Sequence, residues 1–467
     1  MDIINKTFID EDKINGLISK NLKSTTESKE KINEILNKAL KAQGLTLEES
    51  AVLLNIEDDE TLEKLFKTAK IVKEKIYGKR IVIFAPLYAS NVCTNNCVYC
   101  AFRMDNKNIK RTVLTPEEVV EETKALMRMG HKRILLLTGE DYHATGLDYL
   151  QEIMERIYKA KELNGEIRRI NVNIAPLSVE DFKRLNTFEI GTYSLFQETY
   201  RKETYVEMHP SGRKANYEWR LEAMDRALEA GLNDIGIGPL FGLTDYKFET
   251  LATLMHSEHL DKKFGVGPHT ISVPRIEPAE GAELSKNPPA QMSDKEFKKL
   301  VSVIRLAVPY TGLILSTRET PQMRREVIEL GVSQISAASQ TNPGGYHVHK
   351  DAVSQFEAGD TRSLEEMVVE LCEHGFLPSF CTSCYRLGRV GKNFMEHAKT
   401  GHIHTFCQPN ALSTFKEYLE DYGSEKTKEI GNALIKRQLE EITDEKMKEL
   451  TKNNIQKISE GKRDLYI

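Results

Sequence analysis

The sequence lacks the segments that would place a protein in a membrane or carry it across one. No apolar run approaches the roughly 20 residues that span a bilayer, and the N-terminus mixes acids with bases where a signal peptide needs an apolar core. An excess of positive charge is also missing, since 65 Lys and Arg stand against 70 Asp and Glu. We therefore expect a cytoplasmic protein that binds neither membranes nor nucleic acid.

Cysteine is scarce, and its distribution is uneven. Seven cysteines in 467 residues form an odd number, which argues against a disulfide framework in a chain of this kind. Cys372 stands alone in an expected helix, where we interpret it as a small buried hydrophobe. The other six fall into two groups of three, and these groups need a chemical explanation.

The first 78 residues read as helices rich in Lys and Glu. Thr46 and Glu49 have the spacing of a capping box, and a further helix is expected from about Glu60 to Tyr77. We interpret residues 1–78 as an N-terminal helical extension, distinct from the catalytic unit.

Residues 79–345 alternate short apolar runs with amphipathic stretches. One of these helical stretches begins at Thr115-Pro116, with Glu118 in reach of its cap. Eight strands separated by helices favour an α/β fold of the (βα)8 TIM-barrel type, and a doubly wound sheet is the alternative. The expected strands are 80–86, 133–139, 169–175, 188–196, 234–241, 269–275, 312–318 and 332–339. Residues 346–467 read as a mostly helical C-terminal domain.

Cys93, Cys97 and Cys100 follow directly after the first expected strand. Three thiolates on one short loop can bind three corners of a cubane iron–sulfur cluster, which leaves the fourth iron open to a ligand. In a βα barrel this loop opens at the carboxyl ends of the strands, where active sites collect. A structural zinc loop is the alternative, but it needs a fourth ligand, and no His lies within 30 residues of Cys100.

Cys381 and Cys384 form a second group, which Cys407 can join if the tail folds back across the 22 residues between them. Three cysteines again suit a cluster with an open corner. Zinc is a real alternative here, because His402 and His404 lie close by in the sequence. The spacing alone also leaves cysteines without any metal open.

The first group resembles the signature of the radical S-adenosylmethionine superfamily, in which an aromatic residue also precedes the last Cys. The resemblance implies a [4Fe–4S] cluster that binds S-adenosylmethionine. It extends to Thr138-Gly139-Glu140-Asp141, where one family glycine is replaced, and to residues 236–242, which resemble the strand behind the adenine. The cofactor-binding residues that it implies are Tyr99, Gly139, Glu140, Glu198 and Arg220. An ordinary arginine on a surface helix is the alternative for Arg220.

The two cysteine groups together resemble the HydG family of [FeFe]-hydrogenase maturases, which are tyrosine lyases. The similarity runs from about residue 50 and includes FGVGPHTISVPRIEPA and SFCTSCYRLGRVG. It implies that Cys381, Cys384 and Cys407 hold an auxiliary [4Fe–4S] cluster with an extra, labile iron. A barrel histidine ligates that iron in the family; we take His259 first and His269 second, although a lone histidine is more often structural.

Arg275 and Arg318 end the sixth and seventh expected strands. A guanidinium group there offers two parallel donors to a carboxylate, as an amino-acid substrate needs. Pairing with Glu277 and Glu319 is the alternative for each arginine.

The family resemblance implies cleavage of L-tyrosine between Cα and Cβ to p-cresol and dehydroglycine. Dehydroglycine would yield carbon monoxide and cyanide for the precursor of the hydrogenase active site. The implied partners are an electron donor of the ferredoxin or flavodoxin type and other hydrogenase maturation proteins. A 2-iminoacetate synthase of thiazole biosynthesis is the alternative, and it is not expected to use the second cysteine group. A metal carrier without turnover is an alternative from another class.

Overall fold

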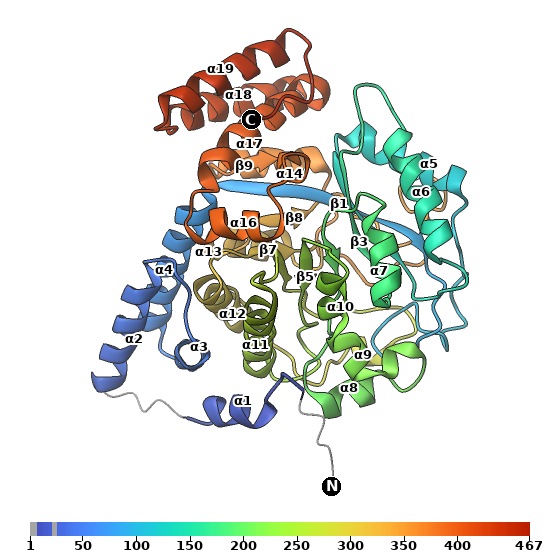
Figure 1. The fold of residues 1–467 in the computed structure, drawn as a ribbon, viewed down its shortest axis with the longest axis vertical. Coiled ribbons are helices and arrows are strands. Elements are labelled where there is room, and N and C mark those ends of the chain that lie inside the picture. The colour runs from blue at the N-terminus through green and yellow to red at the C-terminus, as the bar shows by residue number, and fades with distance from the viewer. Residues whose placement is uncertain (1–6, 21–25) are drawn as a thin grey trace.

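Eight parallel strands form a closed ring at the centre of the molecule (Figure 1). The protein is represented by a computed structural model that describes residues 7–20 and 26–467. Neighbouring strands pair in chain order, and β1 closes the ring by pairing with both β2 and β8. The predicted (βα)8 barrel is therefore confirmed, and the open doubly wound sheet is excluded. The strands are β1 (Arg80–Ser90), β2 (Arg133–Thr138), β3 (Arg169–Asn173), β4 (Tyr193–Ser194), β5 (Ile235–Ile237), β6 (Thr270–Ser272), β7 (Gly312–Leu315) and β8 (Gln334–Ser336).

Helices follow the strands and cover the outside of the ring. Thr115 caps α5 through the expected box: its hydroxyl accepts from Glu118 N, and its own amide donates to the Glu118 carboxylate at 2.8 Å. The helices are α5 (Pro116–Met129), α6 (Leu147–Lys159), α7 (Val179–Asn186), α8 (Lys202–Met208), the 3-10 turn η1 (Arg213–Ala215), α9 (Tyr217–Leu221), α10 (Ala223–Glu229), α11 (Tyr246–Phe264), η2 (Glu283–Ser285), α12 (Asp294–Ala307) and α13 (Pro321–Leu330).

Four N-terminal helices pack on the outside of the barrel, where α3 contacts α11 and α12 and α4 contacts α12 and α13. The capping box of Thr46 and Glu49 is present at the start of α3. Residues 1–6 and 21–25 of the predicted extension lie outside the described residues. The four helices are α1 (Glu11–Ile18), α2 (Thr26–Ala39), α3 (Leu47–Leu54) and α4 (Asp59–Tyr77).

The C-terminal region is mostly helical, as predicted, and also supplies a ninth strand. This strand pairs in parallel with the first residues of β1, next to the ring. This strand was not predicted, because it has only three residues and contains a proline. Figure 1 shows α17, α18 and α19 stacked at one end of the molecule. The elements are α14 (Leu364–Glu373), β9 (Leu377–Ser379), α15 (Ser383–Arg386), α16 (Gly391–Lys399), α17 (His404–Tyr422), α18 (Glu425–Glu440) and α19 (Glu445–Ser459). The three-domain division at residues 78 and 345 stays a prediction.

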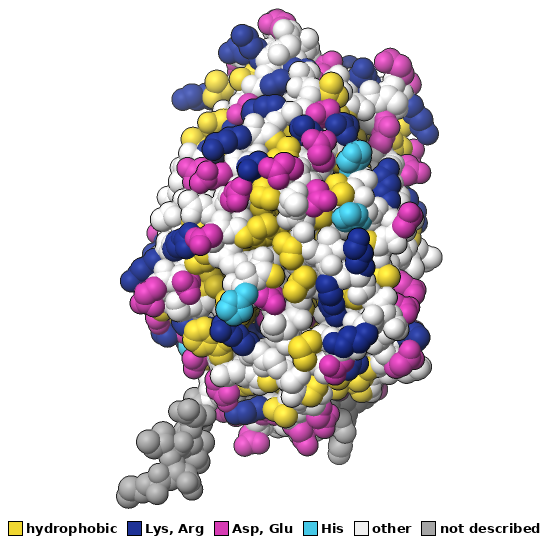
Figure 2. Space-filling model, turned by 90° about the vertical axis from the view of Figure 1, so that its right-hand side faces the viewer, with side chains coloured by type: hydrophobic (Ala, Val, Ile, Leu, Met, Phe, Trp, Pro, Cys, Tyr) yellow, Lys and Arg dark blue, Asp and Glu magenta, His cyan; other side chains and the backbone are white. Residues whose placement is uncertain are grey.

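Charged side chains of both signs are spread over the face of the molecule drawn in Figure 2. Among the described helices, none has the length and apolar character that crossing a membrane requires.

A buried carboxylate fixes the long segment between β8 and α14. Glu122 on α5 is 1% exposed and accepts hydrogen bonds from three consecutive backbone amides, those of Tyr346, His347 and Val348, at 2.7–2.8 Å. The Tyr346 hydroxyl also donates to the carbonyl of Pro86 on β1 at 2.7 Å. Moving the segment away would leave buried groups without hydrogen-bond partners, which costs free energy, so these bonds hold the segment against the barrel.

Replacing Glu122 by alanine is expected to release these three amides. Losing hydrogen bonds to a charged acceptor costs about 1.5–3 kcal/mol, so local opening becomes easier and amide exchange at residues 346–348 speeds up roughly 10- to 150-fold. Hydrogen–deuterium exchange with mass spectrometry measures this. Glu121→Ala is the matched control, since the Glu121 side chain forms an exposed ion pair with Lys124. Equal exchange in both variants would contradict the assignment.

Candidate active site

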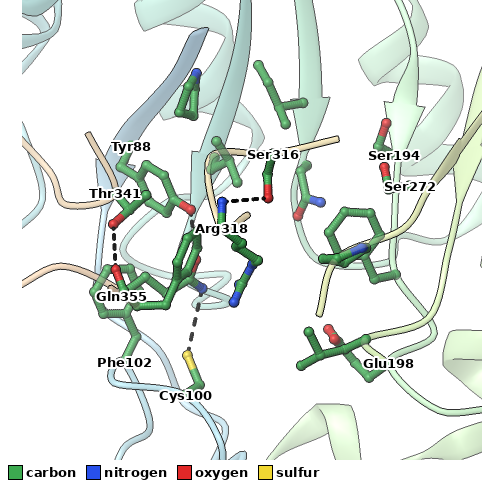
Figure 3. A pocket seen from close by; sticks show the side chains of 18 of the residues that line it. Tyr88, Cys100, Phe102, Ser194, Glu198, Ser272, Ser316, Arg318, Thr341 and Gln355 are labelled. Atoms are coloured by element: carbon green, nitrogen blue, oxygen red, sulfur yellow. Dashed lines mark hydrogen bonds between the residues drawn. The ribbon is translucent and has the colours of Figure 1, made fainter. Parts of the chain in front are cut away.

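A cavity of about 210 Å³ lies inside the barrel at the carboxyl ends of the strands. The interior of such a barrel is usually filled by branched apolar side chains. Here the strands instead turn short polar side chains inward: Asn171, Asn173, Ser194, Ser272 and Ser336. The smaller side chains leave space for a ligand, and Figure 3 shows part of the lining.

Cys93, Cys97 and Cys100 all line this cavity on the loop after β1. Asn95 in the same loop fixes its shape: the Asn95 amide donates to Glu140 Oε2 at 2.8 Å, and its oxygen accepts from the backbone amide of Lys214 at 2.9 Å. The loop is thus held between the end of β2 and the segment around η1.

The three thiols fit a cluster better than a single ion. Burial raises the pKa of each to about 11, so a thiolate there needs a cation beside it. Among the described residues, no three His, Cys, Asp or Glu side chains converge closely enough to hold one metal ion. A cubane does not require such convergence, because each thiolate binds a separate iron. No fourth cysteine or histidine lines the cavity, which disfavours zinc.

Four charged side chains form a network beside the triad, and three of them, Glu198, Lys214 and Arg220, are buried. Arg220 donates to Glu140 Oε1 at 2.9 Å and lies 3.5 Å from Glu198 Oε1, to which Lys214 donates at 2.6 Å. Arg220 is 4% exposed, so it is not a surface helix residue. Burial opposes the ionisation of Glu140, but Arg220 and Lys214 outweigh it and lower the pKa of that carboxyl. An ionised Glu140 at the cavity wall suits a ligand ammonium group.

Gly139 lies where the chain allows no side chain. A Cβ at this position would overlap the carbonyl oxygen of Val92, just before the first cysteine. Thr138, which replaces the other family glycine, lines the cavity beside it.

Tyr99 lines the same cavity, and its hydroxyl lies 2.8 Å from His209 Nε2. His209 Nδ1 is 2.8 Å from the carbonyl oxygen of Tyr205, which can only accept. Nδ1 therefore carries the proton, and Nε2 accepts from the Tyr99 hydroxyl. Asn95, Lys214 and His209 were not predicted as site residues. Asn95 could have been found by its place between the cysteines, whereas the other two have no local signal.

Arg318 carries a positive charge that no side-chain carboxylate pairs with in the described part of the chain. Its guanidinium stacks 3.3 Å from the ring centre of Phe356, and one nitrogen lies 3.5 Å from the Arg275 carbonyl oxygen. Its side chain lines the cavity (Figure 3), where burial lowers the pKa of the guanidinium. An unpaired guanidinium of this kind fits a ligand carboxylate.

Arg275, the other arginine predicted to bind a ligand, is placed differently. Its guanidinium donates to both oxygens of Glu319 and to Asp294 Oδ1 at 2.8 Å. Arg275 is not among the cavity-lining residues. The ion-pair alternative with Glu319 therefore describes Arg275.

Glu277 brings a carboxyl group to the wall of the cavity. Burial and the nearby charge of Glu319 raise its pKa to about 7, although Arg318 and Arg275 oppose the shift. A carboxyl that titrates near neutral pH can take up or release a proton there. From the sequence, Glu277 was expected only as an alternative partner of an arginine.

Cys381, Cys384 and Cys407 come together at the opposite end of the barrel. They line a cavity of about 50 Å³ with residues at the amino ends of strands: Arg80, Arg133, His269 and Gln334. The Nε atoms of Arg80 and Arg133 have no hydrogen-bond partner in the described part of the chain. A hydrogen bond from Cys384 lowers the pKa of Cys407, with Arg80 adding to the effect against burial. Arg133 also donates from Nη2 to the Cys381 carbonyl oxygen at 2.6 Å. Thiols beside two guanidinium cations suit an anionic cluster.

His269 and His259 differ in the same way as the two arginines. His269 lines the second cavity, and burial lowers its pKa, which keeps a neutral imidazole available as a ligand. His259 lies on α11, 2.9 Å from Asp225 Oδ1 and stacked on Phe8, and lines neither cavity. The structure therefore places His269, and not the first choice His259, beside the second triad. His402 and His404, the zinc alternatives, do not line the second cavity either.

Comparisons with known proteins agree with this geometry. A model of the radical SAM superfamily matches residues 87–256, and a model of the biotin and thiamin synthesis associated domain matches residues 272–377. The structure of HydG, a maturase of the [FeFe]-hydrogenase, is 54% identical with a TM-score of 0.95, and the match covers 98% of this chain and all of that one. HydG from Carboxydothermus hydrogenoformans is 44% identical, with a TM-score of 0.82 over 95% of this chain and 97% of that chain. The 2-iminoacetate synthase of Escherichia coli K12 is 31% identical over 75% of this chain and 91% of its own length.

Proposed function

The chain belongs to the radical S-adenosylmethionine superfamily, and we propose that it cleaves L-tyrosine between Cα and Cβ. The products would be p-cresol and dehydroglycine, with dehydroglycine yielding carbon monoxide and cyanide for a hydrogenase active-site precursor. The observation that carries the proposal is the unpaired Arg318 guanidinium in the cavity that Cys93, Cys97 and Cys100 line. The likeness to two HydG structures supports the maturase role.

The family implies a [4Fe–4S] cluster with S-adenosylmethionine, which together supply a 5′-deoxyadenosyl radical when an electron is delivered. Cys93, Cys97 and Cys100 would hold the cluster. Glu140, kept ionised by Arg220, would accept the ammonium group of the bound methionine moiety. Lys214 and Arg220, which pair with Glu198 and Glu140, would face its carboxylate.

Arg318 would hold the tyrosine carboxylate through its two parallel donors. Glu277 lines the same cavity and can take the proton of the tyrosine ammonium, which leaves the neutral amine from which hydrogen is abstracted. Phe102, Phe196, Leu240 and Ile276 line the cavity between these polar groups. They would exclude water, which keeps a reactive radical from side reactions.

The second cavity favours the maturase over a 2-iminoacetate synthase. Three thiols, two arginines and a neutral histidine line this cavity, and we propose that they would hold an auxiliary cluster, with His269 as the ligand of an extra iron. The partners would be an electron donor of the ferredoxin or flavodoxin type and other maturation proteins. The metal-carrier alternative does not account for Arg318 or the Glu140 network.

Anaerobic reconstitution with iron and sulfide, followed by dithionite, S-adenosylmethionine and tyrosine, tests the proposal. We expect 5′-deoxyadenosine and p-cresol by chromatography, and neither from Cys97→Ala, because the cluster loses a corner. Formation of 5′-deoxyadenosine without p-cresol at saturating tyrosine would reject tyrosine as the substrate.

Arg318→Gln should raise the KM for tyrosine roughly 10- to 100-fold, as losing a charge-assisted contact costs about 1.5–3 kcal/mol. Arg318→Lys should recover part of the loss, because the charge returns without the planar fork. Steady-state kinetics with each substrate varied would show an unchanged KM for S-adenosylmethionine. A change only in the KM for S-adenosylmethionine would contradict the assignment of Arg318 to the tyrosine carboxylate.

The double variant Cys381→Ser, Cys384→Ser should keep p-cresol formation and lose most carbon monoxide release, because its cysteines lie at the other end of the barrel. Iron analysis should show the loss of one cluster per chain. Cys372→Ala, at a buried cysteine outside both cavities, is the control. Iron content and carbon monoxide release equal to those of the control would refute the auxiliary cluster.

A further inference from the structure

Gln355 connects the segment after β8 to the first cysteine triad. Its amide nitrogen Nε2 lies 3.7 Å from the Sγ atom of Cys100, and its oxygen Oε1 accepts from the Tyr88 hydroxyl at 2.7 Å. Figure 3 shows the three side chains in line at the cavity wall. Gln355 lies 255 residues after Cys100 in the sequence, so the spacing of the cysteines gives no hint of this contact.

The chemistry of Cys100 determines which end of the amide faces it. A cluster-bound thiolate only accepts hydrogen bonds, and an amide oxygen in the same place would be repelled. The Tyr88 hydroxyl supplies a donor for the opposite end, Oε1. The Gln355 amide therefore directs an N–H group at the sulfur.

Main-chain bonds hold Gln355 in this position. The amides of Gln355, Glu357 and Asp360 donate to the carbonyl oxygens of Thr341, Pro278 and Thr317, at 2.8–3.0 Å. The buried Asp360 side chain also pairs with Arg362 at 2.8 Å and with Arg324 at 3.2 Å. The donor is thus placed before any cluster is bound.

We propose that Gln355 is a positioning residue that raises the reduction potential of a cluster on Cys93, Cys97 and Cys100 by donating a hydrogen bond to the Cys100 sulfur. Reduction adds negative charge to the cluster and its thiolates, and a hydrogen bond to sulfur stabilises the reduced form more than the oxidised one. The inference rests on the proposed first cluster. The electron itself comes from an external one-electron donor.

Phe356, the next residue in the chain, contacts the arginine proposed to bind the tyrosine carboxylate. Phe356 carries the Arg318 guanidinium on its ring, 3.3 Å from the ring centre. One short segment thus positions the donor to Cys100 and the cation of the carboxylate subsite. A substitution that shifts the backbone at residues 355–356 would therefore disturb both the contact to Cys100 and the position of Arg318. Enzyme activity could not separate the two effects, so the test must measure the cluster directly.

The test is a redox titration of the reconstituted protein, monitored by electron paramagnetic resonance without tyrosine. The first cluster is recognised by the change of its signal when S-adenosylmethionine is added. Gln355→Met removes the donor at similar size and should lower the midpoint potential. Gln355→Glu places a carboxylate at the sulfur and should lower it further. Gln340→Glu is the matched control, an exposed glutamine of the same segment, and should leave the potential unchanged.

If a Gln355 variant fails to take up iron, the midpoint potential of Tyr88→Phe tests the same proposal. This substitution leaves Gln355 in place but removes the hydroxyl that orients the amide, and should lower the potential by less than Gln355→Met. An unchanged midpoint potential in Gln355→Met with full iron content would overturn the inference. Absence of any cluster that responds to S-adenosylmethionine in the unmodified protein would instead reject the proposed function.

Discussion

Closure of the parallel sheet between β1 and β2 is the constraint on which the rest of the structure depends. Because all eight strands run in one direction, their carboxyl ends meet at one mouth and their amino ends at the other. The loop of Cys93, the turn at Glu140 and the end of β7 at Arg318 therefore converge without being close in the sequence. Arg80 and Arg133 begin their strands and meet at the opposite end, beside the second triad. Chain direction alone separates the two sites.

At the carboxyl ends of the strands, the pairing of charges then decides which side chains stay free to bind ligands. Glu140, Glu198, Arg220 and Lys214 balance two negative charges with two positive ones, so this network is close to neutral before a ligand arrives. Glu319 is only 2% exposed and is taken by Arg275, which removes it from the reach of Arg318. Arg318 is left with an aromatic ring and a carbonyl oxygen, which cannot neutralise it. The pairing of one arginine thus frees the other.

The sequence predicted the features that depend on local pattern. The strands are short apolar runs between amphipathic helices, and seven of them lie within the expected ranges, while β1 continues to Ser90. The cysteine spacing predicted both triads, which line the two cavities. Tertiary placement decided the rest. Arg275 and Arg318 each follow the end of a strand, β6 and β7, and only the fold shows which one Glu319 reaches. His269 precedes a strand at the barrel end and lines the second cavity, whereas His259 lies on α11 and contacts Asp225.

The segment between β8 and α14 shows why parts of the site have no sequence signal at all. Near its start, three backbone amides bond to Glu122, and near its end Asp360 pairs with Arg324 and Arg362. A segment fixed at both ends has little freedom between them, and the entropy cost of ordering Gln355 is borne by those anchors. The position of the amide relative to Cys100 is therefore set by a backbone bond to Thr341 within the segment and by bonds from Glu357 and Asp360 to residues on other loops. Such positions leave no periodicity to read, because the barrel brings the partners together only once it has closed.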